Sequence, residues 1–128
     1  MSAWFTAFGS KTKMMIWIQI ALGGAIGAVA RYGIGLIFLF PYATLTVNVL
    51  GSFLMGLAFV YLASRSAAAP LIMTGILGGF TTFSAFSLDA LKLYEAGRIA
   101  AASGYVIGSV VSSIFALIIG VAIARGLS

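Results

Sequence analysis

Residues 78–87 read GGFTTFSAFS and lie in the middle of a long apolar stretch. Glycines and hydroxyl side chains gather there, where a helix that crosses lipid has least use for them. Backbone N–H and C=O groups that leave a helix inside a bilayer must find partners in the protein or in a water-filled cavity. The stretch therefore predicts a break in a membrane-spanning helix, and we interpret the break as part of an ion pathway.

Composition identifies the solvent of this chain. Of its 128 residues 62% are hydrophobic and only 7% are charged, and the mean hydropathy is +1.19. Such a composition is typical of an integral membrane protein and exceeds what a water-soluble surface tolerates. The net charge of +5 comes from scattered basic residues that never form a run. This pattern favours anionic lipid headgroups as neighbours and argues against nucleic-acid binding.

The chain contains neither cysteine nor histidine. Without cysteine it has no disulfide, no thiolate nucleophile and no sulfur-ligated metal site. Without histidine it lacks the commonest general base and the commonest transition-metal ligand. We therefore expect that the protein is not an enzyme.

Four apolar stretches are long enough to cross a bilayer, which takes about 20 helical residues per span. They predict an all-α integral membrane protein, with residues 1–128 forming a single membrane domain. Pro41 follows the first stretch, where it ends the helix, and Pro70 opens the third, where it suits a first helical turn. The expected spans are residues 14–38, 44–63, 70–94 and 99–124.

Basic residues are almost evenly divided between the two sides of the membrane, although orientation normally follows their excess on the cytoplasmic side. The acids Asp89 and Glu95 both fall near the second side. A balanced chain is able to insert in both directions and to form an antiparallel, dual-topology homodimer. The alternative is that the lysines that come first set one orientation. The two groups are Lys11, Lys13, Arg65 and Arg125, against Arg31, Lys92 and Arg98.

Assembly is expected from size as well, because four packed helices fill their own centre and two such bundles can line a path between them. Small residues four apart agree with close helix packing. These pairs are Gly23/Gly27, Gly75/Gly79, Ser52/Gly56 and Gly104/Gly108.

Polar side chains inside the spans are costly in lipid and invite a reason. Asn48 places an amide in the second span, either for a hydrogen bond between helices or as a donor to a permeating ion. Tyr105, Ser109 and Ser113 recur every four residues and form a ladder of hydroxyls on one helical face. Arg31 is a headgroup anchor, a positive vestibule that attracts anions, or a brace for a loop.

The ion that this inventory favours is an anion. Cation channels and proton-coupled carriers commonly place carboxylates in the membrane path, whereas the deep portions of these spans contain no Asp or Glu. Phe83 and Phe86 lie on one face of the third span, and an aromatic ring edge carries partial positive charge. Core packing is the alternative role of these rings. Amide, hydroxyl and ring-edge donors would replace the water around a small, strongly hydrated anion.

Three motifs resemble those of the Fluc/CrcB fluoride channels of bacteria. They read GGAIGAVARY at 23–32, TVNVLGSF at 46–53 and GGFTTFSAF at 78–86, in order along essentially the whole chain. The resemblance implies a dual-topology homodimer with two pores that pass fluoride out of the cell across the bacterial inner membrane. That export would relieve fluoride toxicity.

The resemblance also implies roles for single residues. Backbone carbonyls of Gly78 and Thr81 from each subunit would hold a structural sodium ion at the dimer centre. The pore would be lined by the aromatic pair, the amide and the hydroxyls, and the full set is Asn48, Thr82, Phe83, Ser84, Phe86, Tyr105, Ser109 and Ser113. Ala85 and Leu117 depart from the pattern, because hydroxyl residues are usual there.

Other classes of protein fit less well. A coupled fluoride or anion carrier is the nearest alternative to a channel. A small multidrug-type exporter would share the four-helix antiparallel design but needs a glutamate within the first helix, which has no acid here.

Overall fold

The computed structural model describes residues 11–62 and 66–128, which are entirely helical or irregular within those ranges. Arg65, one of the basic residues in the charge balance, lies outside them. The elements are α2 (Lys11–Ile37), α3 (Tyr42–Leu62), η1 (Pro70–Leu77), α4 (Gly78–Phe80), α5 (Phe83–Glu95) and α6 (Ile99–Leu127).

Four helical stretches in the described ranges are long and apolar enough to cross a membrane, and the third of them combines η1, α4 and α5 from Pro70 to Glu95. Helices α2 and α6 extend a few residues past the expected spans, since α2 begins at Lys11 and α6 ends at Leu127. Hydropathy marks only the part of a helix that suits hydrocarbon, whereas the helix itself continues into polar flanks. With 29 residues, α6 is about 44 Å long at 1.5 Å per residue, more than the hydrocarbon core requires.

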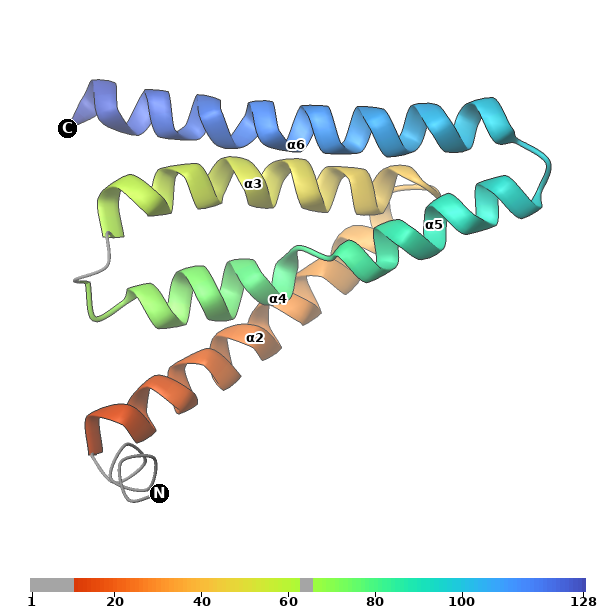
Figure 1. The fold of residues 1–128 in the computed structure, drawn as a ribbon. Coiled ribbons are helices and arrows are strands. Elements are labelled where there is room, and N and C mark those ends of the chain that lie inside the picture. Colours follow the sequence, from red (N-terminus) through yellow and green to blue (C-terminus); the bar gives the residue numbers. More distant parts are fainter. Residues whose placement is uncertain (1–10, 63–65) are drawn as a thin grey trace, which may run out of the picture.

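Helices α6 and α3 run side by side along most of their length, with η1 and α4 beside α3 and α2 crossing obliquely behind (Figure 1). The start of α2 and the end of α6 lie at the same end of the bundle, as an even number of spans requires. Most large apolar side chains on the outside of the bundle are exposed, for example Leu22, Ile107 and Phe115. Such a surface suits lipid and not water.

Glycines allow the closest helix contacts. A methyl group on Gly27 of α2 would overlap the Ile76 carbonyl oxygen, and one on Gly79 would overlap the carbonyl of Gly24. Gly56 of α3 faces the Leu117 carbonyl of α6 in the same way. The backbone of α2 therefore lies directly against the end of η1 and against α4, which places the third span.

Helix α4 ends at Phe80, and α5 begins at Phe83. Between them, Thr81 (φ −76°, ψ 154°) and Thr82 (φ −154°, ψ 121°) have extended backbones. The side chain of Thr82 caps the new helix, because its Oγ1 accepts a hydrogen bond from the Ala85 N–H at 3.2 Å. We refer to these two threonines as the extended segment.

Helix η1 has the wider π-helical winding and leads directly into α4. Wide turns of this kind are frequently found near functional sites. The third span therefore combines a π-helical turn, a short α-helical turn and the extended segment within about half its length, while the other three spans are regular α-helices.

Candidate functional site

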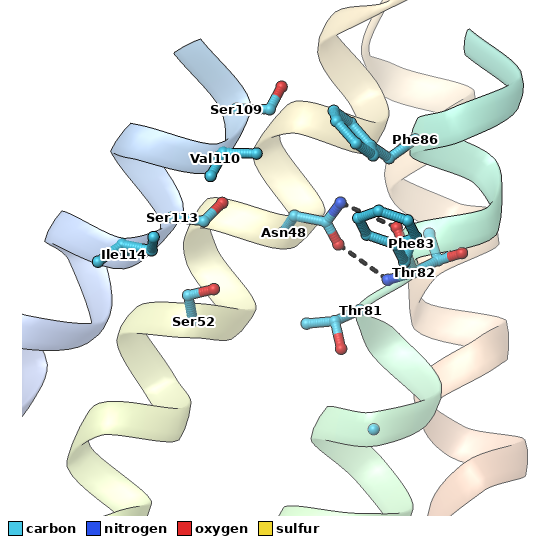
Figure 2. A pocket seen from close by; sticks show the side chains of 11 residues that line it. Asn48, Ser52, Thr81, Thr82, Phe83, Phe86, Ser109, Val110, Ser113 and Ile114 are labelled. Carbon is cyan, nitrogen blue, oxygen red and sulfur yellow. Dashed lines mark hydrogen bonds between the residues drawn. The ribbon is translucent and has the colours of Figure 1, made fainter. Parts of the chain in front are cut away.

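A cavity of about 530 Å³ opens beside the extended segment (Figure 2). Its walls come from α3, from the region where α4 meets α5, and from α6. Eight of the residues expected to line a pore or hold a cation are among its lining: Asn48, Gly78, Thr81, Thr82, Phe83, Phe86, Ser109 and Ser113. Ser52, Val110 and Ile114 complete it.

Asn48 joins α3 to the extended segment through two hydrogen bonds. Its Nδ2 donates to the Thr82 carbonyl oxygen at 2.9 Å, and its Oδ1 accepts from the Thr82 N–H at 2.8 Å. The dashed lines in Figure 2 mark this pair. The interhelical hydrogen bond expected as one alternative is therefore present, and the side chain borders the cavity as well.

Phe83 and Phe86 face one another at the wall of the cavity. Their ring centroids are 5.2 Å apart and their planes are inclined by 50°. The Phe86 ring is 7% exposed and also lies 5.4 Å from the Tyr105 ring, whereas Phe83 is 76% exposed. Packing thus fixes Phe86, while in a single chain Phe83 borders open space.

The hydroxyl ladder of α6 follows Phe86 along the bundle. Tyr105 and Ser109 are 8% and 4% exposed, and their hydroxyl oxygens are the two buried side-chain polar atoms without a hydrogen-bond partner in the described part of the chain. The side chains of Thr44, Asp89 and Ser109 lie near the Tyr105 hydroxyl. A buried hydroxyl without a partner is costly, which makes it a natural contact for a ligand or for water.

Ser113 and Ser84 differ from these two. Ser113 lines the cavity one turn beyond Ser109. Ser84 and Tyr105 are not among the lining residues, and Ser84 is exposed, with its Oγ 3.2 Å from the Oγ1 of Thr82. Ser112, on the neighbouring face of α6, bonds back to the Gly108 and Ser109 carbonyls, as serines in membrane helices often do.

Arg31 contacts the backbone of α4, just before the extended segment. Its Nε donates to the Gly79 carbonyl oxygen at 3.3 Å, and the residue is half-buried. Gly79 lies within α4, so the contact braces a short helix and not a loop, and the three roles open from the sequence stay predictions. Arg31 is not among the residues that line the cavity.

Asp89 is the residue that sequence reasoning missed. The sequence places it near a membrane surface, but it is 8% exposed, and the Thr44 hydroxyl donates to its Oδ2 at 2.6 Å. It follows Phe86 by three residues on the inward face of α5, which also buries Leu93. That spacing was the available signal, since residues three apart share a helical face. Lys92 does not approach this carboxylate closely and lies over the Phe40 ring instead.

Two backbone carbonyls at the cavity have lost their usual helical donors. In an α-helix a carbonyl accepts from the N–H four residues on. The Thr82 N–H, which would serve Gly78, bonds Asn48, and the Ala85 N–H, which would serve Thr81, bonds Thr82 Oγ1. Carbonyl oxygens suit a hard cation such as sodium, so Gly78 and Thr81, whose usual helical donors bond elsewhere, fit the role of sodium ligands.

Other metal chemistry has no comparable support. The described ranges hold no cluster of three or more His, Cys, Asp or Glu side chains that would bind a metal ion.

Two residues depart from the family pattern, Ala85 and Leu117. Ala85 is partly buried and contributes its N–H to the cap of α5, and the Leu117 side chain is exposed on α6.

Comparisons with known proteins identify the family of the chain. The family model described as "CrcB-like protein, Camphor Resistance (CrcB)" matches residues 18–121. A protein of Paracoccus denitrificans named fluoride-specific ion channel FluC is 51% identical over 118 residues, which are 87% of this chain and 95% of the relative.

Proteins with the same name from two other bacteria are similar as well. The one from Cereibacter sphaeroides is 53% identical over 116 residues, or 85% of this chain and 94% of its own length. The one from Saccharophagus degradans is 44% identical over 125 residues, or 91% and 94%. The family match spans most of the four long helical stretches and includes Asn48 and the extended segment. The chain is a multi-pass membrane protein and belongs to the CrcB family.

Proposed function

We infer that this protein is a fluoride-specific ion channel through which F⁻ crosses the membrane passively. The observation that carries the inference is the agreement between the family and the cavity. The relatives that match almost the whole chain are named fluoride-specific channels, and the cavity is bordered by hydrogen-bond donors.

Fluoride is small and holds its water strongly, so a pore must offer donors close to the ion along its path. The amide of Asn48 and the unpartnered hydroxyls of Tyr105 and Ser109 are such donors. The ring edges of Phe83 and Phe86 supply partial positive charge without a full cation. A site of this kind favours an anion and offers little to larger, more weakly hydrated ions.

The proposed pore is completed by a second copy in the opposite orientation. Phe83 is 76% exposed beside a cavity that one chain leaves open, which is unusual for a large aromatic ring at a polar site. The balanced basic residues support insertion in both directions. An antiparallel homodimer would bring two such half-sites together and give two pores.

A sodium ion at the centre of this dimer is part of the proposal. The carbonyl oxygens of Gly78 and Thr81 from both subunits would hold it. When bound, the ion supplies positive potential beside the extended segment and satisfies carbonyls that the helices do not.

In the cell we place the protein in the bacterial inner membrane. There the negative interior potential drives anions outward, because moving one charge through 100 mV is worth about 2.3 kcal/mol. A passive fluoride channel therefore lowers cytoplasmic fluoride and relieves its toxicity without a coupled energy source.

Passive efflux from liposomes tests the function. Liposomes bearing the purified protein are loaded with fluoride or with chloride, and release is followed with ion-selective electrodes while a potassium ionophore carries the balancing charge. We expect rapid fluoride release and retained chloride. Equal release of both anions contradicts a fluoride-specific channel, and fluoride release that requires a co-transported ion identifies a carrier.

Cysteine labelling tests the dimer, and the chain is suitable because it has no cysteine of its own. In cells, Ser66→Cys, between the second and third spans, should be labelled by an impermeant maleimide from both sides of the membrane, in two roughly equal populations. Ala96→Cys, between the third and fourth spans, serves as the matched control on the opposite end. Labelling of each position from one side only would exclude dual topology.

A further inference from the structure

The amide of Asn48 meets the backbone of Thr82 as a matched pair. Thr82 is extended, and a residue in this conformation directs its N–H and its C=O toward the same side, as in a hydrogen-bonded pair of antiparallel strands. One primary amide is therefore able to bond both groups at once, at 2.9 Å and 2.8 Å. A helical residue at this position would direct the two groups oppositely and leave one of them out of reach.

This pair allows only one orientation of the amide. Turning the amide by 180° would set Nδ2 against the Thr82 N–H, donor against donor, and Oδ1 against the Thr82 carbonyl, acceptor against acceptor. The identity of the backbone atoms is known, so the positions of nitrogen and oxygen in the side chain follow from the bonding and are not arbitrary. Figure 2 shows the nitrogen on the side of Phe86 and the oxygen on the side of Thr81.

The orientation decides whether the N–H or the oxygen of the amide faces the cavity. Oδ1 is directed at the Thr82 N–H, while Nδ2 carries two hydrogens and uses one of them for the Thr82 carbonyl. The second hydrogen remains, on the side of the nitrogen away from Oδ1. Asn48 lines the cavity, and the nitrogen is the atom nearer to Phe86. The free hydrogen is thus the pole that an ion beside the aromatic pair would meet.

The extended backbone of Thr82 is itself held in place. Its Oγ1 caps α5 through the Ala85 N–H, and α5 is packed through Phe86 and Leu93 in the core with Ala102 and Tyr105. Turning the amide over would require this cap and the pairing to change together. The local structure is therefore rigid enough to act as a template for the side chain.

We propose that the N–H and C=O of Thr82 are positioning groups that fix the polarity of Asn48, so that the cavity meets an N–H donor and not a carbonyl oxygen. An unrestrained amide would offer either pole, and its oxygen would repel an anion and attract a cation. Anion preference at this point would then be set by a backbone pair that never touches the ion. The inference rests on the proposed fluoride channel for its functional meaning, while the pairing itself is independent of it.

Asparagine labelling gives a direct test, because Asn48 is the only asparagine in the chain. Protein grown with asparagine carrying a nitrogen isotope label shows one side-chain amide group in its NMR spectrum. Any primary amide shows two N–H signals, and without fluoride we expect one of them to be protected from exchange with water by its bond to Thr82. Added fluoride should shift mainly the unprotected signal. Equal exchange of the two hydrogens with water, or equal fluoride shifts of both signals, would overturn the proposal.

A backbone variant separates positioning from general stability. Replacing Thr82 by its α-hydroxy acid removes the N–H and keeps the side chain, so the amide loses one of its two restraints. We expect the two Asn48 signals to lose their difference in exchange. The ratio of fluoride to chloride flux should fall about tenfold, the effect of one misdirected hydrogen bond to a charged group.

The matched control is the same replacement at Phe38, whose N–H bonds the Ile34 carbonyl at 3.1 Å at the end of α2 and which does not line the cavity. It removes a backbone hydrogen bond of similar length and should leave both the signals and the flux ratio unchanged. An unaltered flux ratio in the Thr82 ester contradicts the proposal. If the unmodified protein passes no fluoride, the proposed function fails, while the exchange difference of the two signals still reports the pairing.

Discussion

Two walls of the same cavity treat their polar groups in opposite ways. On the wall formed by the extended segment, Thr82 uses its N–H, its carbonyl and its hydroxyl in hydrogen bonds within the protein. On the side of α6, the hydroxyl of Ser109 is buried at the cavity without any such bond, and so is the hydroxyl of Tyr105, which packs against Phe86 and does not itself line the cavity. The polar groups of Thr82 therefore hold the shape of the extended segment, whereas the hydroxyls of α6 remain available to a ligand.

The difference separates scaffold from contact surface. Groups that have hydrogen-bond partners within the protein hold a conformation that lipid would not otherwise tolerate, since every polar backbone group at this depth needs a partner. A buried hydroxyl without a hydrogen-bond partner lowers the stability of the isolated chain, and a polar ligand that bonds it removes this cost. Asn48 of α3 combines both properties, because its amide bonds the extended segment and still has one hydrogen that a ligand can accept.

The largest effect is expected from Asn48→Asp. A carboxylate cannot donate to the Thr82 carbonyl, so that acceptor loses its partner and faces a negative charge, at a cost of about 1–3 kcal/mol or more. Fluoride efflux from liposomes should fall about 100-fold, equivalent to about 2.7 kcal/mol in the barrier. Thr46→Val on the same helix borders a different groove and should leave efflux unchanged. Normal efflux in correctly folded Asn48→Asp protein would remove the amide from the path.

A smaller effect is expected from Phe83→Ile, which keeps an apolar side chain but removes the ring edge. The residue is largely exposed in one chain, so folding of the subunit should be unaffected. We expect fluoride efflux to decrease about tenfold, or about 1.4 kcal/mol. Phe115→Ile changes an exposed ring on α6 outside the cavity and is the control. Equal losses in the two variants would mean that the ring of Phe83 has no specific role.

The smallest change in rate is expected when a hydroxyl of α6 is removed. Efflux should then fall while the stability of the protein is kept or raised. Tyr105→Phe and Ser109→Ala remove buried hydroxyls that have no partner, so the melting temperature should stay constant or rise. Efflux should fall about fivefold for each, as expected for one hydrogen bond of about 1 kcal/mol. Ser112→Ala, whose hydroxyl already bonds its own helix, should leave efflux unchanged. A loss of stability in the first two variants would show that these hydroxyls are part of the scaffold.

The sequence predicts the membrane spans and many of the residues that line the cavity. Hydropathy and length predicted four spans, and four helices in the described ranges meet those criteria. The motif around Asn48 and the GGFTTFSAFS stretch directed attention to residues that now line one cavity. Spacing along a helix was sufficient to place Phe83 with Phe86 and Ser109 with Ser113.

Other features depended on contacts between helices. The bond of Arg31 to the Gly79 carbonyl joins residues 48 apart in the chain, and spacing along one helix says nothing of it. The sequence places Asp89 near one side of the membrane but does not show its partner, which is the Thr44 hydroxyl supplied by α3. Gly104 and Gly108 look like a packing pair, but a methyl group on either would meet nothing among the described residues of this chain.

The sequence by itself determined the solvent, the number of spans and the kinds of polar group available within them, because these depend on composition and on periodicity along one helix. Tertiary structure decided which polar groups satisfy one another and which remain free. Hydrogen bonding is directional and short, so whether Asn48 presents a donor, or Tyr105 lacks a partner, is fixed only when helices from distant parts of the chain meet.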